Sequence, residues 1–210
     1  MPKPVSTFGG RPRGVLWDVG NVIVRWDPRN LYAKIFEEPA ACDRFLSHVC
    51  TMAWHGLTDR GVPAEQNTAD LIARFPEHEA EIRAWWDRWD EMFGGVIEET
   101  EQAMEALAAR GVPQFGLTNM AGPVWPTIAP MAPAVRHLKA VVVSGDEGLI
   151  KPEPAIYALA SERAGLRPDQ LLFVDDGAVN IAAAAELGFH VLHFTDPSAL
   201  APTLKAHGLL

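Results

Sequence analysis

The feature that most constrains the fold is the alternation of short apolar runs with helical patterns along the chain. The runs are rich in β-branched and aromatic residues and are bounded by turn residues, as buried strands are. Helical patterns that end at Gly111, Gly165 and Gly188 separate most of them. Strand and helix in alternation predict a mainly parallel sheet with helices on both faces. The predicted strands are 14–18, 113–118, 139–144, 170–175 and 189–194.

One long segment departs from this alternation. Residues 28–99 contain no convincing strand and are typical of several amphipathic helices. We therefore expect an α/β protein in two parts. Residues 1–27 and 100–210 would form a Rossmann-like core around a parallel sheet, and residues 28–99 would form an inserted helical cap.

Composition argues against several functional classes. The formal net charge is −9 and no basic stripe is present, so a nucleic-acid partner is not expected. No apolar run approaches the roughly 20 residues that span a bilayer, and the N-terminal segment lacks the apolar stretch of a signal peptide. Cys42 and Cys50 lack the spacing of a zinc site, so we expect two reduced thiols. The sequence thus predicts a cytoplasmic protein with no membrane partner.

Polar side chains stand at the ends of the predicted strands. In an open parallel sheet, ligands bind in the crevice beyond the carboxyl ends of the strands, so we expect these side chains to meet there. Any one of them could be a cap or a turn residue. Strand ends that together deliver carboxylate, hydroxyl and ammonium groups to one crevice indicate a functional site. The residues are Asp18, Thr118, Asn119, Lys151, Asp175 and Asp176.

The chemical types of these residues fit phosphoryl transfer. Carboxylates that share a cleft repel each other unless a hard cation neutralises them, and oxygen ligands of this kind favour Mg²⁺. An aimed carboxylate can attack phosphorus to give an aspartyl-phosphate. Lys151 and Thr118 would supply a charge and a hydroxyl donor to the oxygens of the transferring group. We therefore expect an enzyme with Mg²⁺ as cofactor and a small phosphorylated metabolite as substrate.

The order of these motifs resembles that of the haloacid dehalogenase superfamily of hydrolases. The motifs are "DVGNV" at Asp18, "GLTN" at Thr118, "IKPEP" at Lys151 and "FVDDGAVN" at the acidic pair. The resemblance covers nearly the whole chain and includes a helical cap between the first and second motifs. The first and fourth motifs look most like those of a bacterial branch that includes phosphatases of sugar 1-phosphates, such as α-glucose 1-phosphate.

The resemblance implies a role for each residue of the motifs. Asp18 would be the nucleophile and also a metal ligand, while Thr118 would bind the phosphoryl group. Lys151 would steady both the nucleophile and the phosphate. In the fourth motif, Asp176 would bind the metal directly and Asp175 would act through water.

Position 20 departs from the pattern that the superfamily's phosphatases show. They carry a second Asp two residues after the nucleophile, as general acid and base, whereas this chain has Gly20. The backbone carbonyl of Gly20 can still serve as the remaining protein ligand to the metal. A positioned acid–base group is worth about 10²–10⁴ in rate. We therefore expect substrates whose leaving group needs little protonation, such as anomeric sugar phosphates or aryl phosphates, unless a neighbouring residue replaces the acid.

The departure at Gly20 leaves alternative functions open. A 2-haloacid dehalogenase also lacks this Asp and forms its ester on carbon without a metal, but Asp175 and Asp176 favour Mg²⁺ and phosphorus. A catalytically weak phosphoester-binding or regulatory module is a second alternative. A phosphoacceptor receiver domain is disfavoured, because there the acidic pair lies on the first strand and the lysine on the last.

Further residues are expected to contact the substrate. Asn119 follows a strand end, and Asn21 could cap its turn or donate to phosphate. His55 and Arg60 lie in a cap segment that could close over the cleft. The tryptophans of the helical pattern 79–93 either pack the core of the cap or offer a stacking platform for a sugar ring. We expect a monomer or a homodimer.

Overall fold

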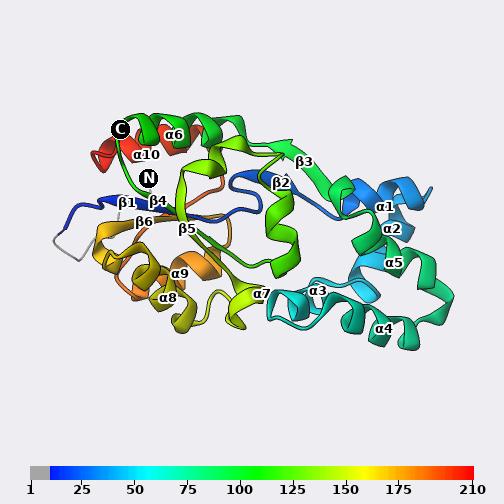
Figure 1. Ribbon diagram of the computed structural model, residues 1–210. Coiled ribbons are helices and arrows are strands. Elements are labelled where there is room, and N and C mark those ends of the chain that lie inside the picture. Colours follow the sequence, from blue (N-terminus) through cyan, green and yellow to red (C-terminus); the bar gives the residue numbers. More distant parts are fainter. Residues whose placement is uncertain (1–9) are drawn as a thin grey trace.

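The core of the molecule is a sheet in which every neighbouring pair of strands is parallel (Figure 1). The computed structural model describes residues 10–210, and within them the sheet has five strands in the order β5-β4-β1-β6-β7. The predicted α/β fold with a parallel sheet is confirmed. The strands are β1 (Gly14–Trp17), β4 (Gln114–Thr118), β5 (Leu138–Val143), β6 (Leu171–Asp175) and β7 (His190–His193).

Helices cover both faces of this sheet, as Figure 1 shows: α6 (Glu98–Ala109) and α10 (Leu200–Ala206) lie on one face, and α8 (Pro154–Ala164) and α9 (Ala178–Glu186) on the other. The short helix α7 (Ser144–Glu147) follows β5. The residues of β1 explain why both faces need cover. Successive side chains of a strand point to opposite faces. Val15 and Trp17 belong to one buried cluster and Leu16 to another.

The helices between residues 29 and 87 form a lobe with a core of its own. Leu31, Phe45, Leu71 and Trp85 are buried in one cluster that is distinct from the two clusters against the sheet. Amphipathic helices shorter than about 12–15 residues are marginal alone, so this shared apolar face stabilises them. The helices are α1 (Arg29–Ile35), α2 (Pro39–His48), α3 (Met52–Asp59), α4 (Ala64–Arg74) and α5 (Glu79–Asp87).

The prediction of a strand-free segment over 28–99 is wrong at one place. The strand β3 (Phe93–Val96) pairs antiparallel with β2 (Val24–Trp26), so a two-stranded ribbon joins the lobe to the core (Figure 1). Glycine has a low strand propensity, so Gly94 and Gly95 make this strand difficult to predict from the sequence. The limits 28 and 99 of the cap remain a prediction, and the ribbon lies beside them.

The helical pattern expected over 79–93 is interrupted. Helix α5 ends at Asp87, and a short 3-10 helix, Trp89–Met92, leads into β3. Trp89 therefore lies beyond the α-helix that carries Trp85. The remaining 3-10 helices are Pro76–His78, Gly122–Thr127, Pro133–His137, Pro168–Gln170 and Pro197–Ala199.

Two expectations from the sequence concern membrane-spanning segments and the two thiols. Among residues 10–210, no helix combines the length and apolarity that a bilayer crossing requires. Cys42 and Cys50 are both free and buried in the lobe. The expectation that no signal peptide is present falls largely on residues 1–9, which lie outside the described residues.

Truncation of a central side chain of the sheet should destabilise the whole core. Phe173 of β6 is fully buried against Tyr157 and Phe189. Phe173→Ala should lower the free energy of unfolding by about 3–5 kcal/mol, because it removes apolar burial and leaves a cavity. Urea denaturation measures this change. As a control, Val179→Ala on α9, where the side chain is 68% exposed, should stay within about 0.5 kcal/mol of the wild type.

Candidate active site

The ends of three adjacent strands place polar side chains in one crevice. Asp18 directly follows β1, Thr118 ends β4 and Asp175 ends β6, and all three are buried. Lys151, from the loop that leads to α8, is also buried and reaches the same place. The structure thus brings together the residues that the sequence predicts for this edge of the sheet.

Lys151 links two of the carboxylates. Its Nζ lies 2.9 Å from Asp18 Oδ1 and 2.7 Å from Asp175 Oδ2. Burial alone would lower the pKa of Lys151, but the two carboxylates raise it above its ordinary value. The ammonium group is therefore held in its charged form, and it orients the side chain of Asp18. If either carboxylate were removed, the buried ammonium group of Lys151 would carry a large desolvation penalty.

Asp175 is occupied by contacts within the protein. Its Oδ1 accepts hydrogen bonds from the backbone N–H of Gly177 at 2.7 Å and from Asn180 Nδ2 at 3.0 Å, in addition to the ion pair with Lys151. These contacts hold Asp175 in a fixed orientation beside Asp18. These contacts suit a carboxylate that positions neighbouring side chains. They suit less well a carboxylate that binds a ligand directly.

Three carboxylates crowd together at this edge of the sheet. Oxygen atoms of Asp18, Asp175 and Asp176 lie within 4.8 Å of one another. Burial, with a smaller contribution from the neighbouring carboxylates, raises the pKa of Asp18 to about 8 against the lowering effect of Lys151. Burial and the charge of Asp175 also raise the pKa of Asp176. One ammonium does not balance three carboxylates, so the donor set fits a hard divalent cation such as Mg²⁺.

Gly20 lies beside this acidic group and lines the same pocket as Asp18. It follows Asp18 by two residues, and it forms an isolated bridge with Val24. A Cβ atom added at Gly20 would meet nothing within 4 Å, and Gly20 is not among the glycines with a positive φ. The backbone therefore has room for a side chain at the position where the related phosphatases carry an acid.

The two asparagines of the predicted site have local tasks. Asn119 lines the pocket and makes two bonds to the backbone of Lys151: Nδ2 donates to its carbonyl at 3.0 Å, and Oδ1 accepts from its N–H at 2.9 Å. Asn21 has a positive φ of 54°, and its Oδ1 accepts from the N–H of Trp26 at 3.0 Å. Asn21 thus closes the turn after β1, and it is not among the residues that line the pocket.

Arg60 is not brought to the pocket. Its Nη1 forms an ion pair of 2.6 Å with Glu153 Oε1, and both side chains are substantially exposed. The contact connects the lobe to the loop before α8. The prediction that Arg60 contacts the substrate is therefore not supported by its position.

His55 is buried in the pocket and packs among indole rings. It is stacked on Trp26 and Trp89, with ring centroids 5.4 and 5.6 Å away. Burial lowers the pKa of His55 to about 4, so its ring is neutral near pH 7. His55 Nε2 lies 3.6 Å from Oδ1 of Asp59, and burial raises the pKa of Asp59 to about 7.

Asp59 is not among the residues that the sequence predicts for the site. It lines the pocket and follows His55 by four residues on α3. That spacing places both side chains on one helical face. The spacing of four residues is therefore the sequence feature from which the pair His55 and Asp59 could have been predicted. Trp26 and Phe93, which also line the pocket, are likewise missing from the prediction as contact residues.

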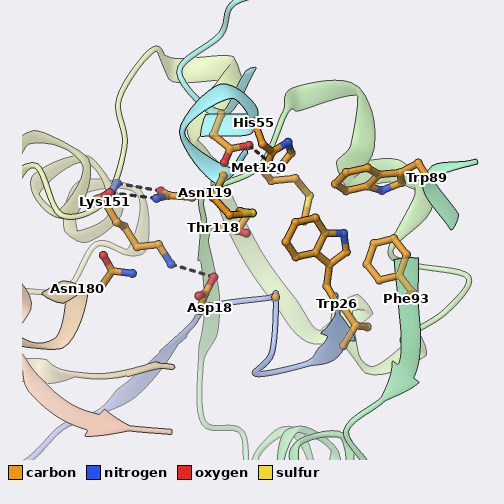
Figure 2. A pocket seen from close by; sticks show the side chains of 14 residues that line it. Asp18, Trp26, His55, Trp89, Phe93, Thr118, Asn119, Met120, Lys151 and Asn180 are labelled. Carbon is orange, nitrogen blue, oxygen red and sulfur yellow. Dashed lines mark hydrogen bonds and ion pairs between the residues drawn. The ribbon is translucent and has the colours of Figure 1, made fainter. Parts of the chain in front are cut away.

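The pocket has two chemically different halves. Figure 2 shows Asp18, Lys151 and Asn180 on one side and the rings of Trp26, Trp89 and Phe93 on the other, with His55 and Met120 between them. The cavity has a volume of about 230 Å³. A polar half from the core and an apolar half from the ribbon and lobe together suit a small molecule with one charged end.

The chain belongs to the haloacid dehalogenase-like hydrolases, because the model of this family matches residues 12–188. This range contains all four motifs and the helical lobe. The family assignment from the sequence is therefore confirmed. The chain is also a distant relative of phosphoglycolate phosphatase: it is 33% identical to that enzyme of Escherichia coli over 120 residues. The match covers 52% of this chain and 46% of the relative, so the chain spans less than half of that curated relative's length.

Solved structures support the fold. A haloacid dehalogenase family enzyme from Bacteroides thetaiotaomicron, in complex with magnesium and inorganic phosphate, has a TM-score of 0.65 at 18% identity. That similarity covers 90% of this chain and 98% of the other. A dehalogenase with an intermediate complex has a TM-score of 0.69 at 15% identity, covering 93% of this chain and 98% of the other. At these identities the likeness establishes the shared architecture alone.

The buried pair His55 and Asp59 should give stability two opposite dependences on pH. The pKa of His55 is lowered from 6.5 to about 4, so the unfolded chain binds a proton first and stability falls as the pH drops through this window. The pKa of Asp59 is raised from 3.8 to about 7, so the folded chain binds a proton first and stability rises as the pH drops from 7. Each effect is on the order of 3 kcal/mol when complete, and in the wild type they largely offset each other.

Melting temperatures at pH 7 and pH 5 test these signs. His55→Gln should gain stability relative to the wild type on acidification, because it no longer has a buried base that resists protonation. Asp59→Asn should lose stability relative to the wild type over the same interval. If the two variants followed the wild type in parallel, the assignment of the two protonation states would be wrong.

Proposed function

We propose that this protein is a magnesium-dependent phosphomonoester hydrolase that works through an aspartyl-phosphate. The observation that carries the proposal is the buried contact of Lys151 with Asp18 and Asp175, beside a group of three carboxylates within 4.8 Å. Asp18, Asp176 and the carbonyl of Gly20 would hold Mg²⁺, with Asp175 acting through water. When bound, the cation supplies positive charge against the carboxylates and the phosphoryl oxygens.

The residues of the chain divide the chemistry between them. Both protein contacts of the Asp18 carboxylate, from Lys151 Nζ and from the N–H of Val19, use Oδ1. Oδ2 would then attack phosphorus, and the bond from phosphorus to the ester oxygen breaks as the leaving group departs with the electron pair. Thr118 and Lys151 would stabilise the charge on the transferring group by hydrogen bonds and proximity. Water would next attack phosphorus, breaking its bond to Asp18 and releasing phosphate.

The substrate is proposed to be a small phosphorylated metabolite. A cavity of about 230 Å³ supports this size, and the polar half of the pocket supports binding of a phosphoryl group. The phosphoglycolate phosphatase of Escherichia coli, whose name states its substrate, supports the reaction class. Sugar 1-phosphates and aryl phosphates fit the proposal for a chemical reason, since their leaving groups depart with little protonation.

Replacement of the nucleophile should abolish turnover. Asp18→Asn removes the attacking carboxylate, so phosphate release from an aryl phosphate with Mg²⁺ present should fall by about 10³-fold or more. As a matched control, Asp70→Asn on the exposed face of α4 should keep wild-type activity. EDTA should suppress the wild type and Mg²⁺ should restore it.

Two other outcomes would favour the alternatives. Release of halide from a 2-chloroacid, insensitive to EDTA, would favour a dehalogenase. A wild type that binds inorganic phosphate with Mg²⁺ but stays inert across a phosphate-ester panel would favour a binding or regulatory module.

An acid introduced at position 20 should widen the range of leaving groups. Gly20→Asp puts a carboxyl group beside the nucleophile without a clash for its Cβ. A positioned acid contributes up to about 10²–10⁴ in rate. The kcat for an alkyl phosphate should therefore rise by about tenfold or more in this variant. Turnover of 4-nitrophenyl phosphate should change little. Gly20→Asn, similar in size but without a carboxyl group, is the control, and an equal gain in that variant would contradict the explanation.

A further inference from the structure

The apolar half of the pocket is built from aromatic rings of four secondary-structure elements. We call Trp26, His55, Trp89 and Phe93 the aromatic cage: they come from β2, α3, the 3-10 helix after α5, and β3. Trp26 and Trp89 have ring centroids 5.5 Å apart, and Trp89 and Phe93 lie edge to face at 5.9 Å. All four line the cavity that also contains Asp18 (Figure 2). The cage therefore lies where the leaving group of a phosphate bound at Asp18 would be.

Several polar atoms of this half are buried without a hydrogen-bond partner among residues 10–210. They are His55 Nδ1, Asp59 Oδ1, Trp26 Nε1 and Trp89 Nε1. Buried donors and acceptors in proteins are nearly always paired, because an unpaired group loses its bonds to water and gains none. All four atoms belong to residues that line the cavity. The atoms themselves are covered, so any bond from a ligand to His55 or Asp59 would use the other nitrogen or oxygen of that side chain.

The charge of the lining selects against an acidic leaving group. Of the described residues that line the cavity, Lys151 is the only lysine or arginine, and it is already paired with two carboxylates. The imidazole of His55 is neutral near pH 7, since burial lowers its pKa to about 4. A second carboxylate on the substrate would be buried beside Asp59 with no cation to pair with it.

The size of the cavity limits the leaving group further. Its volume is about 230 Å³, whereas a dry cavity of about 150 Å³ holds one benzene ring. A phosphoryl group and a single ring fill most of this space.

We propose that the aromatic cage binds an uncharged, single-ring aromatic leaving group, with His55 and Asp59 bonding to a hydroxyl or similar polar substituent on that ring. This proposal rests on the proposed function and specifies its substrate class. Stacking in the cage would bind the ring, and the substituent would form hydrogen bonds to His55 and Asp59, which line the cavity beside the rings. A substrate with a carboxylate, such as phosphoglycolate, would be a poor fit.

Phosphonates test the proposal by binding alone, since they carry a carbon–phosphorus bond that the reaction does not cleave. Calorimetry with Mg²⁺ would compare methylphosphonate, benzylphosphonate, 4-hydroxybenzylphosphonate and phosphonoacetate. Benzylphosphonate should bind about tenfold more tightly than methylphosphonate, as stacking and burial of a ring predict. The hydroxyl should add about threefold through its hydrogen bonds. Phosphonoacetate should bind no better than methylphosphonate.

Variants locate the preference in the cage. Phe93→Leu should reduce the ratio of benzylphosphonate to methylphosphonate affinity several-fold, whereas the matched control Phe75→Leu, in the lobe and outside the pocket, should keep it. Asp59→Leu should remove the gain from the hydroxyl, and Asp70→Leu on the exposed face of α4 should keep it. Each readout is a ratio, so a general loss of folded protein does not imitate the expected result.

The outcomes separate this proposal from the proposed function. Equal affinity for all four phosphonates, a preference for phosphonoacetate, or ratios unchanged in Phe93→Leu would overturn the cage as a ring site, even if the wild type hydrolyses phosphate esters. The expected ratios in a protein that hydrolyses no phosphate ester would uphold ring binding and overturn the hydrolase.

Discussion

The double ion pair of Lys151 with Asp18 and Asp175 is the interaction on which the rest of the site depends. One ammonium and two carboxyl groups are buried where β1, β6 and the loop before α8 meet, and their mutual contacts stabilise them there. The contact fixes Asp18 at the end of its strand. Asn119 holds the backbone of Lys151 in turn, so an adjacent strand end supports the same contact.

The pocket combines two kinds of surface because two parts of the chain contribute to it. The carboxyl ends of the core strands supply charges and hydrogen-bonding groups, which suits a phosphoryl group. The ribbon β2–β3 and helix α3 supply rings, which suit an apolar leaving group. Gly20 fits this division. It leaves open space beside the nucleophile, and a substrate whose leaving group departs unaided needs no acid there.

Membership of the haloacid dehalogenase-like hydrolases does not by itself choose between phosphorus and carbon chemistry. The architecture is shared with an enzyme bound to magnesium and phosphate and with a dehalogenase, at similarly low identity. The acidic group beside Asp18 supports the proposed phosphorus chemistry, because carbon chemistry of the dehalogenase kind needs no metal. Three carboxylates with a single ammonium leave an excess of negative charge that a divalent cation would balance.

Local patterns in the sequence determined the parallel sheet, the segments that form its strands and the polar residues at their ends. This works because a buried strand and its terminal residue are set by periodicity and turns within a few positions. Only the tertiary structure decided which parts of the lobe meet the site. It revealed β3 behind its two glycines, brought His55 and Asp59 of α3 into the pocket, paired Arg60 with Glu153 instead, and assembled Trp26, Trp89 and Phe93 into one wall. These contacts depend on how the lobe packs against the core. The periodicity of a sequence shows which face of a helix or strand is apolar, but it does not show which other surface that face packs against.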